Sequence, residues 1–212
     1  MRPAKFGFPP GRIFIPLLLS LLPLSALPAQ TDWTMSTTLT EDKAYLTVGS
    51  IEFSASPEKL WQVLTDYERA DAWLVRGLDT PAGWKYPTYI QAVQFSPEVP
   101  AMEIHYGLRF FGFLDRDDLS IVFAIRENRI QDRYRLVLTL TEEYPFVTEG
   151  EYTLTLEESG GGTTRMDYMI RTKLPPLIRT FLPKGLYNDN VRYFIGQMMV
   201  NLHERSTRPL NP

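Results

Sequence analysis

Apolar side chains near the end of the chain recur at steps of three and four residues. This period predicts an amphipathic helix over Tyr187–Arg205. The apolar stripe consists of Val191, Phe194, Ile195, Met198, Met199 and Leu202. Polar residues fall mainly on the opposite side, at Asp189, Asn190, Arg192, Gln197, Asn201 and Glu204. Methionine adapts its shape to varied apolar neighbours, so the stripe suits either a filled core or one wall of a ligand pocket.

The residues before this helix alternate between apolar and polar side chains, which is the period of a strand with one buried face. A first strand is predicted over Ala44–Ser54. Consecutive antiparallel strands are then predicted at Tyr89–Ser96, Met102–Leu114, Asp118–Arg126, Asp132–Thr141, Thr148–Glu157 and Thr164–Lys173. Such a sheet needs an apolar partner for its buried face. The predicted C-terminal helix can supply that partner.

The last two predicted strands can be aligned from their side chains. A Ser-Gly-Gly-Gly turn at 159–162 joins them. One register brings together three pairs of opposite charges: Glu157 with Arg165, Glu151 with Arg171, and Glu149 with Lys173. On the other face, the same register joins Leu156 with Met166, Leu154 with Tyr168, and Tyr152 with Ile170. Because a slip of one residue would invert both faces, we expect this register.

Short helices are predicted between the first strand and the others. Ser56 followed by Pro57 and Glu58 is typical of a helix start, with Ser56 as the N-cap. A second short helix is predicted around Glu68–Val75, and a helical turn at Leu177–Leu182. Since strands and helices are segregated along the chain, the pattern predicts an α+β fold rather than a parallel α/β sheet.

The first 29 residues predict a secretory signal peptide. Three basic residues precede the short apolar stretch Ile13–Leu24, and small residues follow it up to Ala29. The stretch is shorter than the ~20 residues of a spanning helix, and an uncleaved anchor is the alternative. We therefore expect an exported protein, periplasmic or secreted, with no stable membrane span after cleavage. The predicted organisation is a signal peptide at 1–29, a flexible lead-in at 30–42, a folded domain at 43–206 and a tail at 207–212.

Charge and composition narrow the function classes. Without its first 29 residues the chain has 19 basic and 25 acidic residues, a formal net charge of −6. This balance argues against nucleic acid as a partner. The chain has no cysteine and only two histidines, so we expect neither disulfides nor a histidine-rich metal site, and no cofactor. The oligomeric state stays open.

A further signal lies between the first strand and the loop that follows the short helices. The sequence Ile51-Glu-Phe-Ser-Ala-Ser-Pro-Glu-Lys-Leu-Trp-Gln-Val-Leu-Thr-Asp-Tyr67, followed by Trp73, resembles the START-like helix-grip superfamily. That superfamily includes steroid- and lipid-transfer domains and polyketide aromatase/cyclases. The resemblance implies a curved antiparallel sheet wrapped around a long C-terminal helix, with a pocket between them. Fold resemblance alone does not assign a function.

In such a fold, inward-facing aromatic residues and the helical stripe would line the pocket. The candidate ligand-binding residues are Trp73, Tyr106, Phe110, Phe123, Tyr134, Tyr152, Tyr168, Val191, Phe194, Ile195 and Met198. A mostly apolar wall with a few hydroxyls suits an oriented apolar ligand, although the hydroxyls could instead bond the protein's own backbone. The leading hypothesis is an exported carrier of a small hydrophobic molecule, a lipid or a polycyclic compound.

Two alternatives remain at this stage. The first is a cyclase- or hydrolase-like enzyme, because Glu103, His105 and Arg109 share one face of a predicted strand and could act as an acid/base set if that face turned inward. Alternation favours a solvated face instead, and nucleophile-elbow, zinc-protease and phosphate-loop motifs are missing. The second is a structural protein that contacts envelope partners through Phe111 and Phe113.

Overall fold

Eight antiparallel strands form one curved sheet in the computed structural model, which describes residues 33–79, 88–109 and 115–207. The strands are β1 (Thr34–Leu39), β2 (Tyr45–Phe53), β3 (Thr88–Ser96), β4 (Ala101–Leu108), β5 (Arg116–Ile130), β6 (Arg133–Leu140), β7 (Glu149–Gly160) and β8 (Thr163–Lys173). Their order across the sheet is β1-β2-β8-β7-β6-β5-β4-β3. Strand β4 ends at Leu108, six residues before the predicted end, and residues 110–114 lie outside the described part of the chain.

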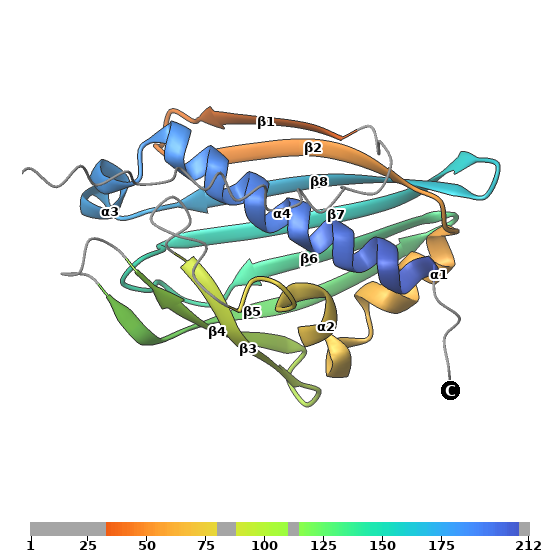
Figure 1. Ribbon diagram of the computed structural model, residues 1–212, viewed down its shortest axis with the longest axis horizontal. Coiled ribbons are helices and arrows are strands. Elements are labelled where there is room, and N and C mark those ends of the chain that lie inside the picture. The colour runs from red at the N-terminus through yellow and green to blue at the C-terminus, as the bar shows by residue number, and fades with distance from the viewer. Residues whose placement is uncertain (1–32, 80–87, 110–114, 208–212) are drawn as a thin grey trace, which may run out of the picture.

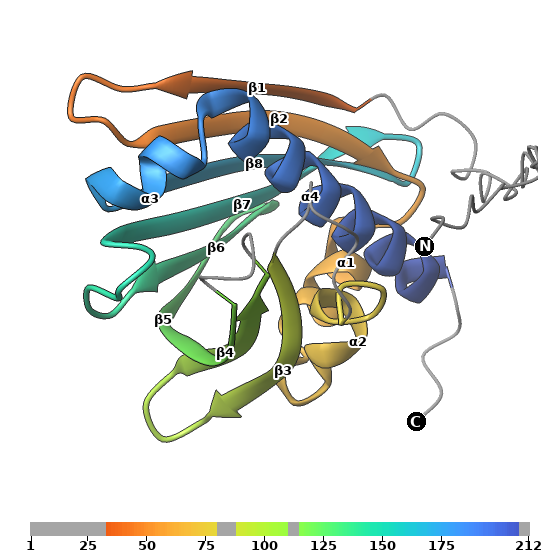
Figure 2. The ribbon, with the colours of Figure 1, turned by 60° about the vertical axis from the view of Figure 1, so that its left-hand side comes forward.

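Helices lie on one face of this sheet. They are α1 (Pro57–Leu64), the 3-10 turn η1 (Tyr67–Arg69), α2 (Asp71–Leu74), α3 (Pro176–Phe181) and α4 (Lys184–Thr207). The long helix α4 crosses the sheet, with α3 near its start and α1 and α2 near its end (Figure 1). Figure 2 shows the strands from β1 to β3 curving around α4. We call the side of the sheet toward α4 the inner face.

Local sequence accounts for the start of α1. The Ser56 side chain accepts a hydrogen bond from the Lys59 backbone N–H at 3.4 Å, and Pro57 occupies the first turn, where it removes a donor that would have no partner. Leu60 and Leu64, one turn apart, face the core and are fully buried. The predicted N-cap is therefore confirmed.

The apolar core is divided into two clusters. The larger one joins the inner face of the sheet to α1, α2 and the second half of α4, and it includes Trp73, Leu136 and Leu202. The smaller one contains Tyr45, Leu174 and Tyr187 near the start of α4. Val191 packs against both clusters, so the first half of α4 connects them.

The polar side of α4 differs from the sequence prediction. The sequence pattern puts Asn190 and Asn201 on the side opposite the apolar stripe, yet both are buried. The Asn201 side-chain amide donates to the backbone carbonyls of Trp73 at 3.2 Å and Arg76 at 2.9 Å. Those carbonyls lie at the end of α2, so Asn201 attaches α2 to α4. Helix periodicity could not reveal this role because it depends on which segment packs against the helix.

The predicted register of the β7–β8 hairpin is confirmed. Glu149 pairs with Lys173, Glu151 with Arg171 and Glu157 with Arg165. Glu149 forms ion pairs with Lys173 at 2.6 Å and with Arg171 at 2.5 Å, and these cations hold the pKa of Glu149 below its usual value. The Glu157 carboxylate instead pairs with Arg133 of the neighbouring strand β6. Arg171 pairs with Glu149 and Asp42 rather than with Glu151, so charge predicted the register but only one of the three ion pairs, Glu149–Lys173.

The predicted flexible lead-in at 30–42 is wrong for residues 34–39, which form β1. This strand pairs with β2 along its whole length, and its alternate residues Met35 and Thr37 face inward. The Thr37 hydroxyl bonds Thr47 of β2 at 2.9 Å and donates to the Asn188 side-chain oxygen of α4 at 2.9 Å. Because β1 consists mainly of serine and threonine, its sequence does not show the alternation of apolar and polar residues that predicts a strand. Its backbone pairing with β2 is what makes this segment a strand.

Two glycines allow tyrosines to lie flat against the neighbouring strand. Gly49 of β2 is paired with Tyr168 of β8, and Gly107 of β4 is paired with Tyr89 of β3. A Cβ atom at either glycine would overlap the phenol of the paired tyrosine. The Tyr168 hydroxyl accepts a hydrogen bond from the Trp33 indole at 2.7 Å and donates to the Thr34 carbonyl at 3.1 Å. Tyr168 therefore links β8 to β1 across Gly49.

Candidate functional site

Five hydroxyl side chains lie between the inner face and the first half of α4, each near enough to at least one other to influence a pKa. We call them the inner hydroxyl cluster, and they are Thr47 of β2, Tyr106 of β4, Tyr152 of β7, Thr172 of β8 and Tyr187 of α4. The sheet register places these residues on one face, because Thr47 and Thr172 belong to the same alternating set as buried Tyr45 and Ile170. The cluster lies between the larger and smaller core clusters.

Tyr187 is held in place by packing rather than by its hydroxyl. Its ring stacks on Tyr45 with the centroids 4.2 Å apart, and Tyr45 donates to the Leu182 carbonyl at 2.9 Å. Only 5% of Tyr187 is exposed, and its hydroxyl has no hydrogen-bond partner among the described residues. Thr172 and Thr47 lie near enough to influence its pKa but outside hydrogen-bond geometry. The cluster therefore contains an unsatisfied buried hydroxyl.

Tyr152 is surrounded by other parts of the protein, yet some of its side chain is accessible to solvent. Burial raises the pKa of its hydroxyl, and the neighbouring Thr172 hydroxyl partly offsets this rise. Its side chain is nevertheless only half-buried, unlike Leu154 two residues later on the same face. Tyr152 therefore keeps accessible surface on the inner face although the surrounding protein raises its pKa.

Apolar side chains lie beside the ring of Tyr152. Phe123 of β5 meets Tyr152 edge to face with the ring centroids 5.2 Å apart. Further apolar residues of the inner face or of the α4 stripe are only partly buried: Ile121, Leu138, Leu140, Val191 and Phe194. Gly150 leaves room for no more than a methyl group, since a Cβ atom placed there would already be in contact with Leu140 and Phe123 at 3.5 Å. The inner face here is apolar and incompletely covered.

The tyrosines of the cluster stay protonated at neutral pH. Burial, together with Tyr152 and Tyr144, raises the pKa of Tyr106 to about 12. Burial also raises the pKa of Tyr187, again with a contribution from Tyr152. A neutral phenol can donate and accept hydrogen bonds but is a poor proton acceptor. This geometry therefore suits recognition of a ligand by hydrogen bonding.

Comparison with known proteins identifies the family. The sequence profile of the family described as activator of Hsp90 ATPase homolog 1-like protein matches residues 54–176. The chain belongs to this family. None of the curated proteins compared with the chain matches it.

Solved structures share the fold of this family member. A START superfamily protein from Mycobacterium smegmatis has 13% identity over 76% of this chain and 95% of its own, with a TM-score of 0.51. Human STARD10 has 14% identity over 84% of this chain and 70% of its own, also with a TM-score of 0.51. Human StAR-related lipid transfer protein 5 has 12% identity over 82% and 81%, with the same TM-score. The predicted α+β, START-like helix-grip fold is confirmed, and this fold is consistent with binding a hydrophobic ligand.

The START-like fold brings some of the predicted ligand-binding residues to the incompletely covered region. Near the inner hydroxyl cluster lie Tyr106, Phe123, Tyr152 and Val191, and Phe194 follows Val191 on the same apolar stripe of α4. These five come from β4, β5, β7 and α4. Phe110 lies outside the described residues.

The other predicted residues belong to the larger core cluster. They are Trp73, Tyr134, Tyr168, Ile195 and Met198. Tyr134 donates to the Glu58 carboxylate at 3.1 Å and packs against Trp61, at the end of the sheet that α1 covers. Tyr168 fills the place of the side chain that Gly49 lacks. Inward alternation was correct for the two strand residues, Tyr134 and Tyr168, but inward side chains along one strand face different neighbours.

Sequence reasoning did not select Thr47, Gly150, Thr172 or Tyr187 for the site. Thr47 and Thr172 share the inward alternation of their strands and could have been found by that signal. Tyr187 precedes Val191 by one helical turn and so extends the apolar stripe. Gly150 has no side chain from which the sequence could predict a role. Its place beside Leu140, Phe123 and Tyr152 is evident only from the tertiary structure.

The candidate acid/base residues lie away from the cluster. Glu103 and His105 point to the opposite side of β4 from Tyr106, and their side chains approach each other at 3.5 Å. Arg109 pairs with the Asp117 carboxylate of β5, which also accepts a hydrogen bond from Tyr89. The enzyme alternative requires these three residues to lie close to the inner tyrosines, and the structure does not place them there.

Other site types find no support in the described residues. Within residues 33–79, 88–109 and 115–207, no group of three or more Asp, Glu or His side chains could hold a metal ion. No helix in this part of the chain has both the length and the apolar character needed to cross a membrane.

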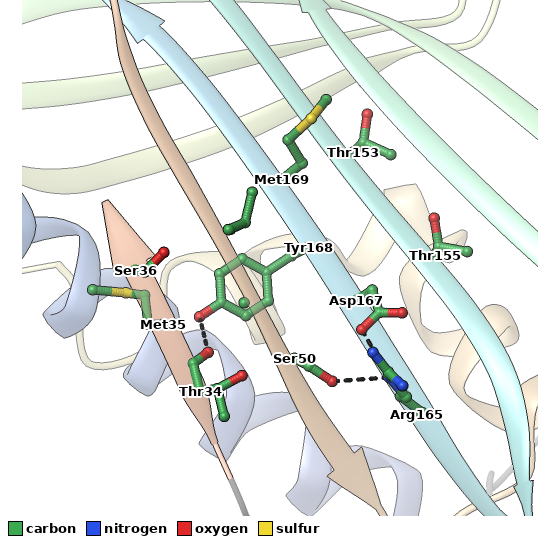
Figure 3. Close-up of a pocket in the computed structure, with 12 residues that line it drawn as sticks. Thr34, Met35, Ser36, Ser50, Thr153, Thr155, Arg165, Asp167, Tyr168 and Met169 are labelled. Atoms are coloured by element: carbon green, nitrogen blue, oxygen red, sulfur yellow. Dashed lines mark hydrogen bonds and ion pairs between the residues drawn. The ribbon is translucent and has the colours of Figure 1, made fainter. Parts of the chain in front are cut away.

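An open hollow of about 530 Å³ lies on the outer face of the sheet, across β1, β2, β8 and β7. Its lining includes Val48, Thr153 and Met169, and an Arg165–Asp167 ion pair at 2.9 Å forms one end (Figure 3). Arg165 also donates to the Ser50 hydroxyl at 3.2 Å. Because this hollow is open and its charges are already paired, the inner face is the better candidate for holding an apolar molecule.

Proposed function

We propose that this protein binds a small hydrophobic molecule, a lipid or a polycyclic compound, between the inner face of the sheet and α4, and that it does so after export. The observation that carries the proposal is Tyr152, which lies deep in the fold yet keeps accessible surface among partly buried apolar side chains. Burial of apolar surface is favourable by about 25 cal/mol per Å², so a ligand that covered this accessible surface would gain that free energy.

The fold supports the proposal that the protein binds a hydrophobic molecule. A solved structure with the same fold carries lipid transfer in its name, human StAR-related lipid transfer protein 5. The candidate signal peptide at 1–29 supports export, because its basic start, short apolar centre and small residues match that signal. Fold alone does not fix the ligand.

Native mass spectrometry of the protein produced in an exporting host tests both parts of the proposal. We expect a polypeptide mass that lacks residues 1–29 and an additional apolar molecule that organic extraction releases. A full-length mass in the membrane fraction would contradict export. A processed protein that is ligand-free after gentle purification, and that binds no hydrophobic probe when titrated, would contradict the binding proposal.

Substitution of Gly150 tests where the ligand lies. The Gly150→Leu variant should lower the affinity for the fluorescent probe N-phenyl-1-naphthylamine at least about tenfold, or roughly 1.4 kcal/mol. The added side chain would exceed the methyl-sized room beside Leu140, Phe123 and Tyr152. The matched control is Gly150→Ala, whose Cβ atom makes only ordinary contacts and should leave the affinity close to that of the wild type.

A second control separates the inner face from the outer hollow. Val48 lines that hollow and is 44% exposed, so Val48→Lys should fold normally and should not affect probe binding. Loss of binding in Val48→Lys with full binding in Gly150→Leu would place the ligand in the outer hollow instead. Thermal unfolding of each variant shows whether a binding loss reflects the site or the fold.

A further inference from the structure

The inward strand positions around the inner hydroxyl cluster are uncharged in the described part of the chain, and Arg179 acts on the pKa of Tyr45 outside the cluster. The inward positions of the surrounding strands hold only neutral side chains: Tyr45, Thr47, Met102, Ile104, Tyr106, Ile121, Phe123, Leu138, Leu140, Gly150, Tyr152, Ile170 and Thr172. The pKa values of Tyr106, Tyr152 and Tyr187 are shifted by burial and by neighbouring hydroxyls, and no charged residue contributes to these shifts. The cluster therefore has no counter-charge for an ionised ligand.

One hydroxyl of the same cluster lacks a hydrogen-bond partner in the part of the chain that the structure describes. The Tyr187 hydroxyl is buried with no partner among the described residues, and the accessible Tyr152 side chain lies beside it. A buried polar group without a partner destabilises the protein, and a ligand atom that bonded it would recover that free energy. A charged ligand group would gain these hydrogen bonds too, but it would lose its hydration without meeting an opposite charge.

We propose that the inner hydroxyl cluster recognises an uncharged oxygen, the hydroxyl or carbonyl of an amphipathic lipid, and discriminates against ionised headgroups. Tyr187 and Tyr152 donate to this oxygen, and Thr172 between them accepts when the ligand group is a hydroxyl. The apolar part of the ligand lies against Phe123, Leu140 and Phe194. This inference rests on the proposed function, because it assigns the ligand class of the same site.

Three matched probes test the discrimination: 10-(1-pyrenyl)decanol, 1-pyrenyldecane and 10-(1-pyrenyl)decanoic acid at a pH where the acid is ionised. They share the ring and the chain and differ only at the end group. We expect the alcohol to bind about fivefold more tightly than the hydrocarbon, as one or two neutral hydrogen bonds allow. We expect it to bind at least about tenfold more tightly than the ionised acid.

Removal of single hydroxyls tests the assigned residues. Tyr187→Phe and Tyr152→Phe should each bring the affinity for the alcohol toward that for the hydrocarbon and leave the hydrocarbon affinity unchanged. Tyr134→Phe is the matched control, since Tyr134 is a buried tyrosine at the other end of the core, bonded to Glu58. Its alcohol preference should equal that of the wild type. Thermal unfolding identifies any variant that fails to fold. If one of the two tyrosine variants fails to fold, the other one tests the assignment.

The outcomes separate this inference from the proposed function. If none of the three probes binds, the binding function itself fails. If all three bind equally, or the ionised acid binds most tightly, the function stands and the proposed ligand class is wrong. If the alcohol preference survives in both tyrosine variants, the recognition lies elsewhere and the assignment to this cluster is wrong.

Discussion

Replacing Trp73 by alanine is expected to lower the free energy of unfolding by about 3–5 kcal/mol. Trp73 is 1% exposed within the larger core cluster, so its loss would leave a cavity that the packed helices cannot fill. Its backbone carbonyl also anchors the Asn201 amide, and a cavity at this point would loosen the contact between α2 and α4. Denaturant unfolding followed by circular dichroism measures the change.

The Trp73→Phe variant is the matched control. Phenylalanine keeps most of the apolar volume and removes an indole N–H that is buried with no hydrogen-bond partner among the described residues. We expect a much smaller loss than for alanine, about 1 kcal/mol. An alanine variant that is as stable as the wild type but no longer binds the probe would instead assign Trp73 to the ligand site, where the sequence first suggested it.

Replacing Gly49 by alanine is expected to destabilise the fold by about 3 kcal/mol or to prevent folding, because overpacking at a rigid site has a large cost. The added Cβ atom would overlap both the Tyr168 phenol and the backbone carbonyl of Thr34. A side chain can move aside, but the carbonyl belongs to β1, whose pairing with β2 would have to break. The yield of folded protein and its unfolding midpoint measure the effect.

Two other glycines of the same sheet provide controls for this prediction. Gly150→Ala should cost less than about 1 kcal/mol, because its Cβ atom would make only ordinary van der Waals contacts. Gly107→Ala overlaps only the side chain of Tyr89, so the double variant Gly107→Ala/Tyr89→Ala should recover part of the loss. Removal of the Tyr168 phenol should not rescue Gly49→Ala to the same extent. An equal rescue at both glycines would show that the Thr34 carbonyl can move.

The sequence by itself determined the features that depend on neighbours within one or two elements. The Ser56 cap, the order of strands and helices, and the register of β7 against β8 follow from local chemistry and from alternating side chains. The resemblance carried by residues 51–67 was sufficient for the START-like fold, because it spans a strand, a capped helix and the aromatic residues that pack beneath α4.

Only the tertiary structure decided which inward side chains pack and which remain partly accessible. Tyr152 and Tyr168 both face inward from adjacent strands, yet Tyr168 fills the space above Gly49 while Tyr152 borders the incompletely covered region. Asn201 is similar, since its partners are carbonyls more than 100 residues away in the chain. Alternation fixes the face of a strand, but the neighbours on that face depend on how all eight strands align and curve around α4.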